Sequence, residues 1–178
     1  FRSYDSNQSL KFNYKIGDGA PPYSSIYKEN SDDLRGCKYL GFWHKPTGKS
    51  NQMAIRLSEG NGTIWDYYFD IEGDSGKYTE VALADFSKYS GASDSINLAD
   101  IAEISINILK GNGEYGESVI YLDDIKFLTE KSTVAIDNKI EKKTGPAKIN
   151  LERFENSGEG GETYMESFSV AFLGGGGG

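Results

Sequence analysis

The feature that most constrains the fold is a series of short segments in which apolar and polar residues alternate one by one. In the first, Leu10, Phe12 and Tyr14 alternate with lysine and asparagine. A period of two residues is that of a β-strand with one buried face. The same pattern predicts strands over 9–16, 26–28, 39–45, 53–57, 64–71, 79–83, 104–109 and 119–128.

Glycine-rich turns separate these segments at regular intervals. They are Gly17-Asp18-Gly19, Gly60-Asn61-Gly62, Gly73-Asp74-Ser75-Gly76 and Gly111-Asn112-Gly113. Many short strands joined by such turns are typical of an all-β chain. We therefore predict a β-sandwich or jelly roll of two antiparallel sheets. The one helical element expected is a turn near 98–102.

The chain of 178 residues is long enough for one domain with a sizeable core. Residues 1–128 are predicted to form the main body of the sandwich. Residues 129–148 are rich in lysine, glutamate, asparagine and threonine, which favours a linker or long loop. Apolar alternation then resumes, so 149–173 are predicted to return as strands of the same sandwich. The glycines of 174–178 predict a flexible tail.

Composition excludes several classes of function. A net charge of -8 argues against a nucleic-acid partner, because phosphate binding needs a basic face. No apolar run approaches the length of a membrane span. Cys37 and His44 are the only residues of their types, too few for a zinc site, and Cys37 has no partner for a disulfide within the chain. We expect His44 to be structural or on the surface rather than catalytic.

Paired carboxylates need separate treatment, because they are all that a glycosidase requires. Asp66 and Asp70 share one face of a predicted strand but lie about 13 Å apart, beyond the roughly 5 to 10 Å that glycosidases use. Asp123 and Asp124 are adjacent and would point to opposite faces of a regular strand. A pair from two neighbouring strands stays possible. A jelly-roll glycoside hydrolase or lyase is therefore the alternative function.

A sugar offers an apolar ring face to an aromatic side chain and hydroxyl groups to polar ones. In 64–71, the apolar set that includes Trp65 is predicted to face the core, and Asp66 and Tyr68 to face outward. Arg56 lies on the non-core face of its own strand.

Tyr39 and Trp43 alternate with Leu40 and Phe42, and the pattern leaves open which set is core. The candidate carbohydrate-binding residues are Tyr23, Trp43, Arg56, Asn61, Asp66, Tyr68 and Tyr89.

Several of these segments resemble a known family. Tyr39-Leu40-Gly41-Phe42-Trp43, Trp65-Asp66-Tyr67-Tyr68-Phe69 and the closing strand Ile120-Tyr121-Leu122-Asp123-Asp124-Ile125 carry the likeness. The sequence over 10–128 resembles carbohydrate-binding modules of families 11 and 30, which are β-jelly rolls attached to secreted plant-cell-wall hydrolases. The resemblance implies an aromatic platform at Tyr23. It also implies a structural Ca²⁺ between the opening glutamate and the closing-strand aspartate, here Glu155 and Asp123. The alternative is that both are solvated acids.

The chain departs from the family at its start. Glu152-Arg153-Phe154-Glu155 resembles the strand with which such modules open, although it lies near the other end of this chain. We hypothesise a circular permutation, in which 149–173 fill the place of the family's first strands. One alternative is a truncated second module that exchanges strands with a neighbouring chain. Another is an extension that covers one edge of a sheet.

The sequence thus predicts a non-catalytic carbohydrate-binding module. It would bind a plant-cell-wall polysaccharide of the β-glucan or mannan type and target an attached hydrolase. The resemblance implies a secreted protein that belongs to a larger enzyme. The enzyme described above is the second hypothesis, and a structural or adhesion domain is the third.

Overall fold

The structure is a computed structural model that describes residues 9–18, 23–132, 147–150 and 155–156. Its strands are β1 (Leu10–Ile16), β2 (Tyr23–Glu29), β3 (Tyr39–Thr47), β4 (Asn51–Glu59), β5 (Ile64–Ile71), β6 (Lys77–Ala82), β7 (Ser87–Ser90), β8 (Ile101–Leu109), β9 (Gly116–Leu128), β10 (Ala147–Asn150) and β11 (Glu155–Asn156). A short 3₁₀ helix, η1 (Leu83–Asp85), precedes β7. No helix within these residues is long and apolar enough to span a membrane.

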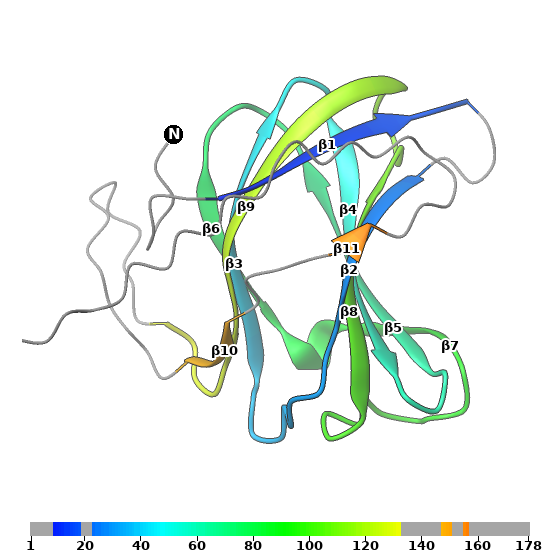
Figure 1. Cartoon of the computed structure of the whole chain (residues 1–178), viewed down its shortest axis with the longest axis vertical. Coiled ribbons are helices and arrows are strands. Elements are labelled where there is room, and N and C mark those ends of the chain that lie inside the picture. Colours follow the sequence, from blue (N-terminus) through cyan, green and yellow to red (C-terminus); the bar gives the residue numbers. More distant parts are fainter. Residues whose placement is uncertain (1–8, 19–22, 133–146, 151–154, 157–178) are drawn as a thin grey trace, which may run out of the picture.

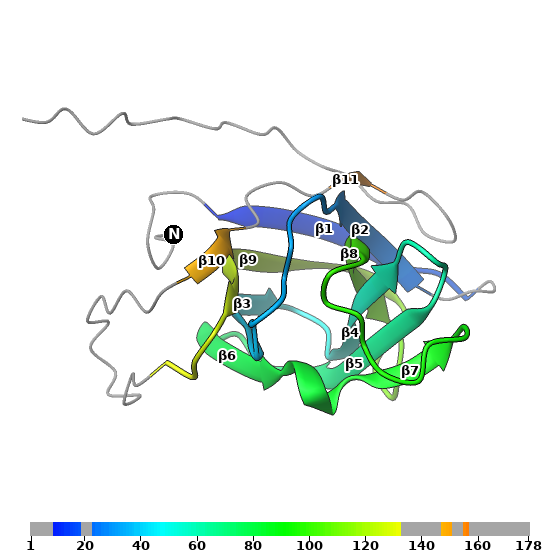
Figure 2. The same ribbon diagram turned by 90° about the horizontal axis from the view of Figure 1, so that it is seen from below.

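The strands form two antiparallel sheets that pack face to face (Figures 1 and 2). The five-stranded sheet has the order β1-β9-β3-β6, with β10 also paired to β9. The six-stranded sheet has the order β11-β2-β8-β4-β5-β7. Strands that are consecutive in the chain often lie in different sheets, as in a jelly roll. The predicted all-β sandwich of two antiparallel sheets is confirmed.

The core lies between the inner faces of the two sheets, where the alternating apolar residues meet. Phe12 and Tyr14 in β1 are buried there, as the alternation predicted. His44 is also fully buried, with its ring centroid 5.5 Å from that of Phe42 and 5.6 Å from that of Phe69. Burial, with a smaller effect from the charge of Lys77, lowers the pKa of His44 to about 4. The histidine is therefore neutral and structural in the folded protein.

Two local expectations are wrong. Residues 98–102 do not form a helical element, because Ile101 already begins β8 and the chain before it makes a turn in which Asp100 N donates to Asn97 O. The helical turn is η1 instead. The sequence pattern also missed β7, whose four residues are all exposed and thus carry no apolar alternation.

The C-terminal segment contributes to both sheets. β10 pairs with the end of β9, and β11 pairs with β2 through Glu155 opposite Tyr27. β10 begins at Ala147, inside the segment 129–148 that was predicted to be a linker. Most of 149–173, and the glycines of 174–178, lie outside the described residues. The circular permutation and the returning strands therefore stay predictions.

Candidate functional site

The outer face of the six-stranded sheet, which points away from the other sheet, carries most of the predicted binding residues. Its register places Tyr27 of β2, Ser105 of β8, Arg56 of β4 and Asp66 of β5 in one cross-strand row. Tyr68 follows in the next row, opposite Ala54. Because side chains alternate along each strand, these residues share the face opposite to the core residues between them.

Arg56 and Asp66 form an ion pair at the centre of this face. Arg56 Nε and Nη2 each donate to one Asp66 carboxylate oxygen, at 2.8 Å in both cases. The Asp66 side chain is 1% exposed and that of Arg56 is 26% exposed. The hydrogen bonds to Asp66 raise the pKa of Arg56 despite its partial burial, so the guanidinium stays charged. A two-point contact of this kind fixes the plane of the guanidinium group.

Two tyrosines complete this arrangement. Tyr68 Oη donates to Asp66 Oδ2 at 2.7 Å, and the guanidinium carbon of Arg56 lies 4.5 Å from the centre of the Tyr89 ring. Burial, together with the hydrogen bond to Asp66, raises the pKa of Tyr68 to about 12. Tyr68 is 42% exposed and Tyr89 is 62% exposed. We call Arg56, Asp66, Tyr68 and Tyr89 the Arg56 cluster.

The Arg56 cluster has the chemistry that a sugar requires. The two exposed rings offer apolar surface, to which the apolar face of a pyranose can pack. Arg56 Nη1 has no hydrogen-bond acceptor within the described part of the chain, so its N–H groups can donate to hydroxyl oxygens. Asp66 already balances the charge of Arg56, which favours a neutral ligand over an anionic one.

Small side chains occupy the middle of the outer face. Ser25, Ser105, Asn107 and Ala54 point away from the core yet are all buried. Ser105 lies between Tyr27 and Arg56 in one cross-strand row, and Ser25, Asn107 and Ala54 form the next row, which continues to Tyr68. Small side chains on β8 and β4 therefore separate the tyrosines of β2 from Tyr68 of β5.

Of the seven predicted residues, Arg56, Asp66, Tyr68 and Tyr89 come together, and Tyr23 lies on the same face in β2.

The expectation for Asp66 requires a correction. It points away from the core as predicted, but at 2% exposure it is not presented to solvent. Its position beneath Arg56 and Tyr68 makes it the residue that orients them. The sequence could not show this, because cross-strand neighbours are set by register.

Trp43 lies elsewhere. It belongs to β3 in the five-stranded sheet, opposite Tyr78 and Asp123, and the core residue Phe42 shows that Trp43 points to the outer face of that sheet. Its indole lies against Gly76, where an added Cβ would come within 2.1 Å of the ring. At 9% exposure, Trp43 is largely buried, and it lies on the other side of the sandwich from the Arg56 cluster.

Asn61 is also separate from the Arg56 cluster. Its Oδ1 accepts from Thr63 N at 2.8 Å, and its Nδ2 donates to Glu59 and to Ser93, each at 3.1 Å. Both polar atoms of the amide are therefore engaged within the protein. Sequence reasoning missed Glu59 itself, a buried acid at the end of β4. Its place directly before Gly60-Asn61-Gly62 was the available signal.

The predicted calcium ligands are only partly described. Asp123 lies in β9, where Asp124 has a φ of 54° and the pairing with β3 shifts register. This irregularity removes the expectation that Asp123 and Asp124 point to opposite faces. Asp124 is ion-paired with Lys126, a cation that would oppose a metal. No group of three or more histidine, cysteine, aspartate or glutamate side chains that could hold a metal ion occurs among the described residues.

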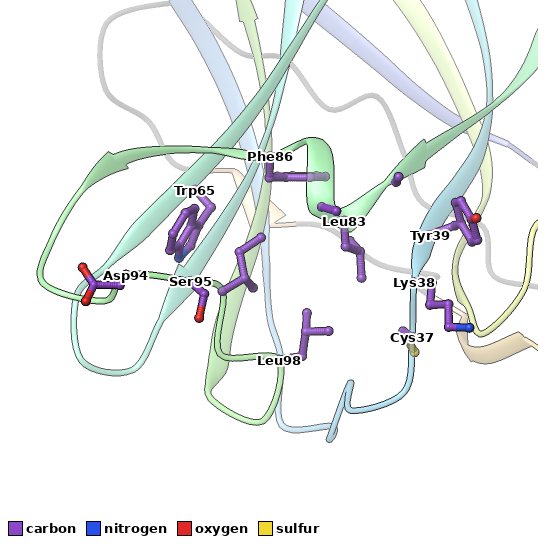
Figure 3. A pocket seen from close by; sticks show the side chains of 12 residues that line it. Cys37, Lys38, Tyr39, Trp65, Leu83, Phe86, Asp94, Ser95 and Leu98 are labelled. Atoms are coloured by element: carbon purple, nitrogen blue, oxygen red, sulfur yellow. The ribbon is translucent and has the colours of Figure 1, made fainter.

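A pocket of about 600 Å³ lies at one end of the sandwich (Figure 3). The connection between β2 and β3, η1 and the connection between β7 and β8 enclose it. Leu83, Phe86 and Leu98 give it a mainly apolar lining, with Asp94 and Ser95 on one side. None of the seven predicted binding residues lines it. The pocket is thus distinct from the outer face that carries the Arg56 cluster.

Comparison with known proteins supports the fold. No protein-family model matches the chain, and no curated protein matches it. An exo-β-agarase structure is similar over 70% of this chain and 21% of that one, with 13% identity and a TM-score of 0.55. This similarity confirms the jelly-roll fold that the sequence predicted.

Two solved structures of family 11 carbohydrate-binding modules from Clostridium thermocellum were also found. One is the module of a cellulosomal cellulase, with 17% identity and a TM-score of 0.49 over 66% of this chain and 75% of that one. The other is in complex with a β-1,3-1,4-mixed-linked tetrasaccharide, with 18% identity and a TM-score of 0.49 over 66% of this chain and 76% of that one.

Proposed function

We propose that this chain is a non-catalytic carbohydrate-binding module that binds a polysaccharide through the outer face of its six-stranded sheet. The observation that carries the proposal is the Arg56 cluster, in which two exposed tyrosines flank a guanidinium group held by a buried carboxylate. This arrangement combines apolar ring surface with fixed hydrogen-bond donors. A sugar chain needs both.

The class of glycan follows from the sequence resemblance to families 11 and 30. We propose a plant-cell-wall chain of the β-glucan or mannan type. The same resemblance supports secretion and attachment to a hydrolase that the module would bring to its substrate. A neutral chain also suits the outer face, because its one arginine is paired and Glu29, Glu103 and Asp70 add negative charge.

The experiment is affinity electrophoresis through gels that contain one polysaccharide each, with and without a chelator. Retardation without released product is the expected result. The double variant Tyr68→Ala, Tyr89→Ala should migrate as in a gel without polysaccharide. Tyr115→Ala is the matched control, because Tyr115 is 46% exposed but lies in the connection between β8 and β9. Loss of retardation in that control alone would place binding elsewhere.

One observation favours the enzyme as a second candidate. Glu29 of β2 and Glu103 of β8 lie directly opposite each other, which gives the cross-strand carboxylate pair that the sequence left open. Burial raises the pKa of Glu103, Arg56 opposes this effect and Glu29 adds to it. A carboxyl group of raised pKa beside a second carboxylate is the pair that a glycosidase uses. Oligosaccharide release that Glu103→Gln abolishes would establish this activity in place of the first.

Calcium remains part of the proposal only through the family resemblance. Asp123 and Glu155 would hold the ion, with further ligands from outside the described residues. We expect Ca²⁺ to raise the unfolding temperature and a chelator to reverse the effect, since an ion that binds the folded state stabilises it. Asp123→Asn should remove this dependence. A wild-type unfolding temperature that is the same in both conditions would exclude the site.

A further inference from the structure

Two connections of the six-stranded sheet meet at one buried carboxylate. Glu59, the last residue of β4, is 3% exposed. Its carboxylate accepts hydrogen bonds from Trp65 Nε1 at 2.8 Å, Asn97 N at 2.9 Å, Ser93 Oγ at 2.6 Å and Asn61 Nδ2 at 3.1 Å. Burial raises the pKa of Glu59, but these four donors outweigh it and the net pKa is lowered. The group is therefore ionised and tightly held.

The donors tie the residues after β7 to the turn between β4 and β5. Ser93 and Asn97 follow β7, whereas Asn61 lies in the turn. Thr63 Oγ1 donates to Ser93 Oγ and accepts from Ser93 N, at 3.2 Å in both cases. Gly91, at a φ of 101°, lies so close to Thr63 that an added Cβ would be 2.4 Å from its Cα atom. We call Glu59, Asn61, Thr63, Ser93 and Asn97 the Glu59 anchor.

β7 itself has few other contacts that fix its position. It is an edge strand of four exposed residues, and it pairs with β5 at only three positions, with a register shift between two of them. Nevertheless, Tyr89 in this strand lies over the guanidinium group of Arg56. The placement of an exposed ring on a short edge strand depends on what holds the chain on either side of it.

We propose that Glu59 is a positioning residue for carbohydrate binding, which anchors the residues after β7 and thereby holds Tyr89 over Arg56. This inference rests on the proposed function, in which Tyr89 contacts the sugar. Glu59 acts only through Tyr89. In this assignment Asn61 is a part of the anchor and not a ligand of the sugar.

The binding test compares Glu59→Gln, Tyr89→Ala and the double variant by affinity electrophoresis. Glutamine keeps the size of the side chain. Its amide NH₂ group, however, is a hydrogen-bond donor and would face the groups that donate to the Glu59 carboxylate. We expect Glu59→Gln to weaken binding roughly 3- to 10-fold, as Tyr89→Ala does, on the scale of one aromatic contact. The double variant should bind no more weakly than Tyr89→Ala alone. Additive losses would overturn the inference.

A second measurement needs no glycan. The NMR resonance of the Arg56 Nε proton reports the position of the Tyr89 ring beside it. In Glu59→Gln it should move toward its value in Tyr89→Ala, whereas Glu114→Gln, which changes an exposed acid in another connection, should leave it in place. Ser93→Ala tests the same anchor from the other side and decides the question if Glu59→Gln does not fold.

The two measurements distinguish failure of the positioning role of Glu59 from failure of the proposed carbohydrate binding. An unchanged Arg56 resonance in both anchor variants overturns the inference whatever the glycan result. A resonance that moves as expected, in a protein whose wild type no polysaccharide retards, refutes the proposed function and leaves the anchoring role of Glu59 intact.

Discussion

The outer faces of the two sheets both carry aromatic residues but use them differently. On the five-stranded sheet, Trp43 lies over Gly76 and the Tyr78 ring lies over Gly41. On the six-stranded sheet, Tyr68 and Tyr89 stand beside an ion pair and remain 42% and 62% exposed. A glycine opposite an aromatic residue lets the ring lie close to the backbone, which reduces its exposure. Beside the Arg56–Asp66 ion pair, the Tyr68 and Tyr89 rings stay accessible to solvent.

An aromatic residue outside the core is therefore not by itself a ligand platform. What decides its role is the neighbour that the register supplies. Trp43 and Tyr68 occupy comparable positions in their own strands, each alternating with core residues. One stabilises its sheet and the other is available to a ligand. Three of the predictions below test this division of roles, and one tests the core beneath the five-stranded sheet.

Trp43→Ala should have the largest effect on stability. Removing a buried indole costs about 3 kcal/mol, because the cavity above Gly76 cannot be refilled by backbone. Urea unfolding would measure the loss. Polysaccharide retardation at temperatures where the variant is folded should equal that of the wild type. Weaker binding by a folded Trp43→Ala protein would contradict the division between the two faces.

Asp66→Ala should come next, and it should affect both stability and binding. Removing one partner of a buried ion pair leaves Arg56 unpaired, at a cost of about 3 kcal/mol reduced somewhat by the partial exposure of Arg56. Retardation should also be lost. Asp70→Ala, an exposed acid on the same face of β5, is the matched control and should change the free energy of unfolding by less than about 0.5 kcal/mol. Equal effects of the two variants would refute the central role of Asp66.

The five-stranded sheet should confer a pH dependence through His44. Its pKa is about 4 when folded and about 6.5 when unfolded, so the unfolded chain binds the proton first. Stability should therefore fall as the pH drops from about 6.5 to about 4, by about 3 kcal/mol over that window. His44→Phe should flatten this part of the profile. A histidine resonance that titrates near pH 6.5 in the folded protein would contradict the prediction.

Tyr68→Phe should have the smallest effect. It removes one hydrogen bond to Asp66 from a half-exposed ring, at a cost of about 1 kcal/mol in stability. Binding should weaken only modestly, since the ring surface stays. In the wild type the alkaline titration of Tyr68 should centre near pH 12, and Asp66→Asn should lower it, because an uncharged partner no longer opposes the tyrosinate. A Tyr68 pKa that Asp66→Asn leaves unchanged would show that the two residues are not coupled.

The sequence pattern predicted most strands to within a few residues, because a half-buried strand must alternate. Residues 64–71 were predicted with the bounds that β5 has in the structure. The pattern failed at β7, where an exposed edge strand has no apolar face to reveal it. It also failed at Asp124, whose left-handed backbone breaks the alternation on which the face assignment of Asp123 depended.

The candidate site was predictable only in part. Arg56, Asp66 and Tyr68 could each be assigned to a non-core face from their own strands. Nothing in the sequence indicated that Asp66 would lie beneath the other two, or that Trp43 would lie on the other sheet. The Glu59 anchor joins residues 38 positions apart and leaves no local pattern.

Neighbours along the chain are enough to predict that it forms strands with one buried face and that helices are rare, because residue alternation and turn residues are local properties. Which outward residues meet depends on the tertiary structure, since strand order and register bring together side chains that are distant in sequence. The pairing of Arg56 with Asp66, the packing of Trp43 on Gly76 and the anchoring of β7 by Glu59 all arise in this way.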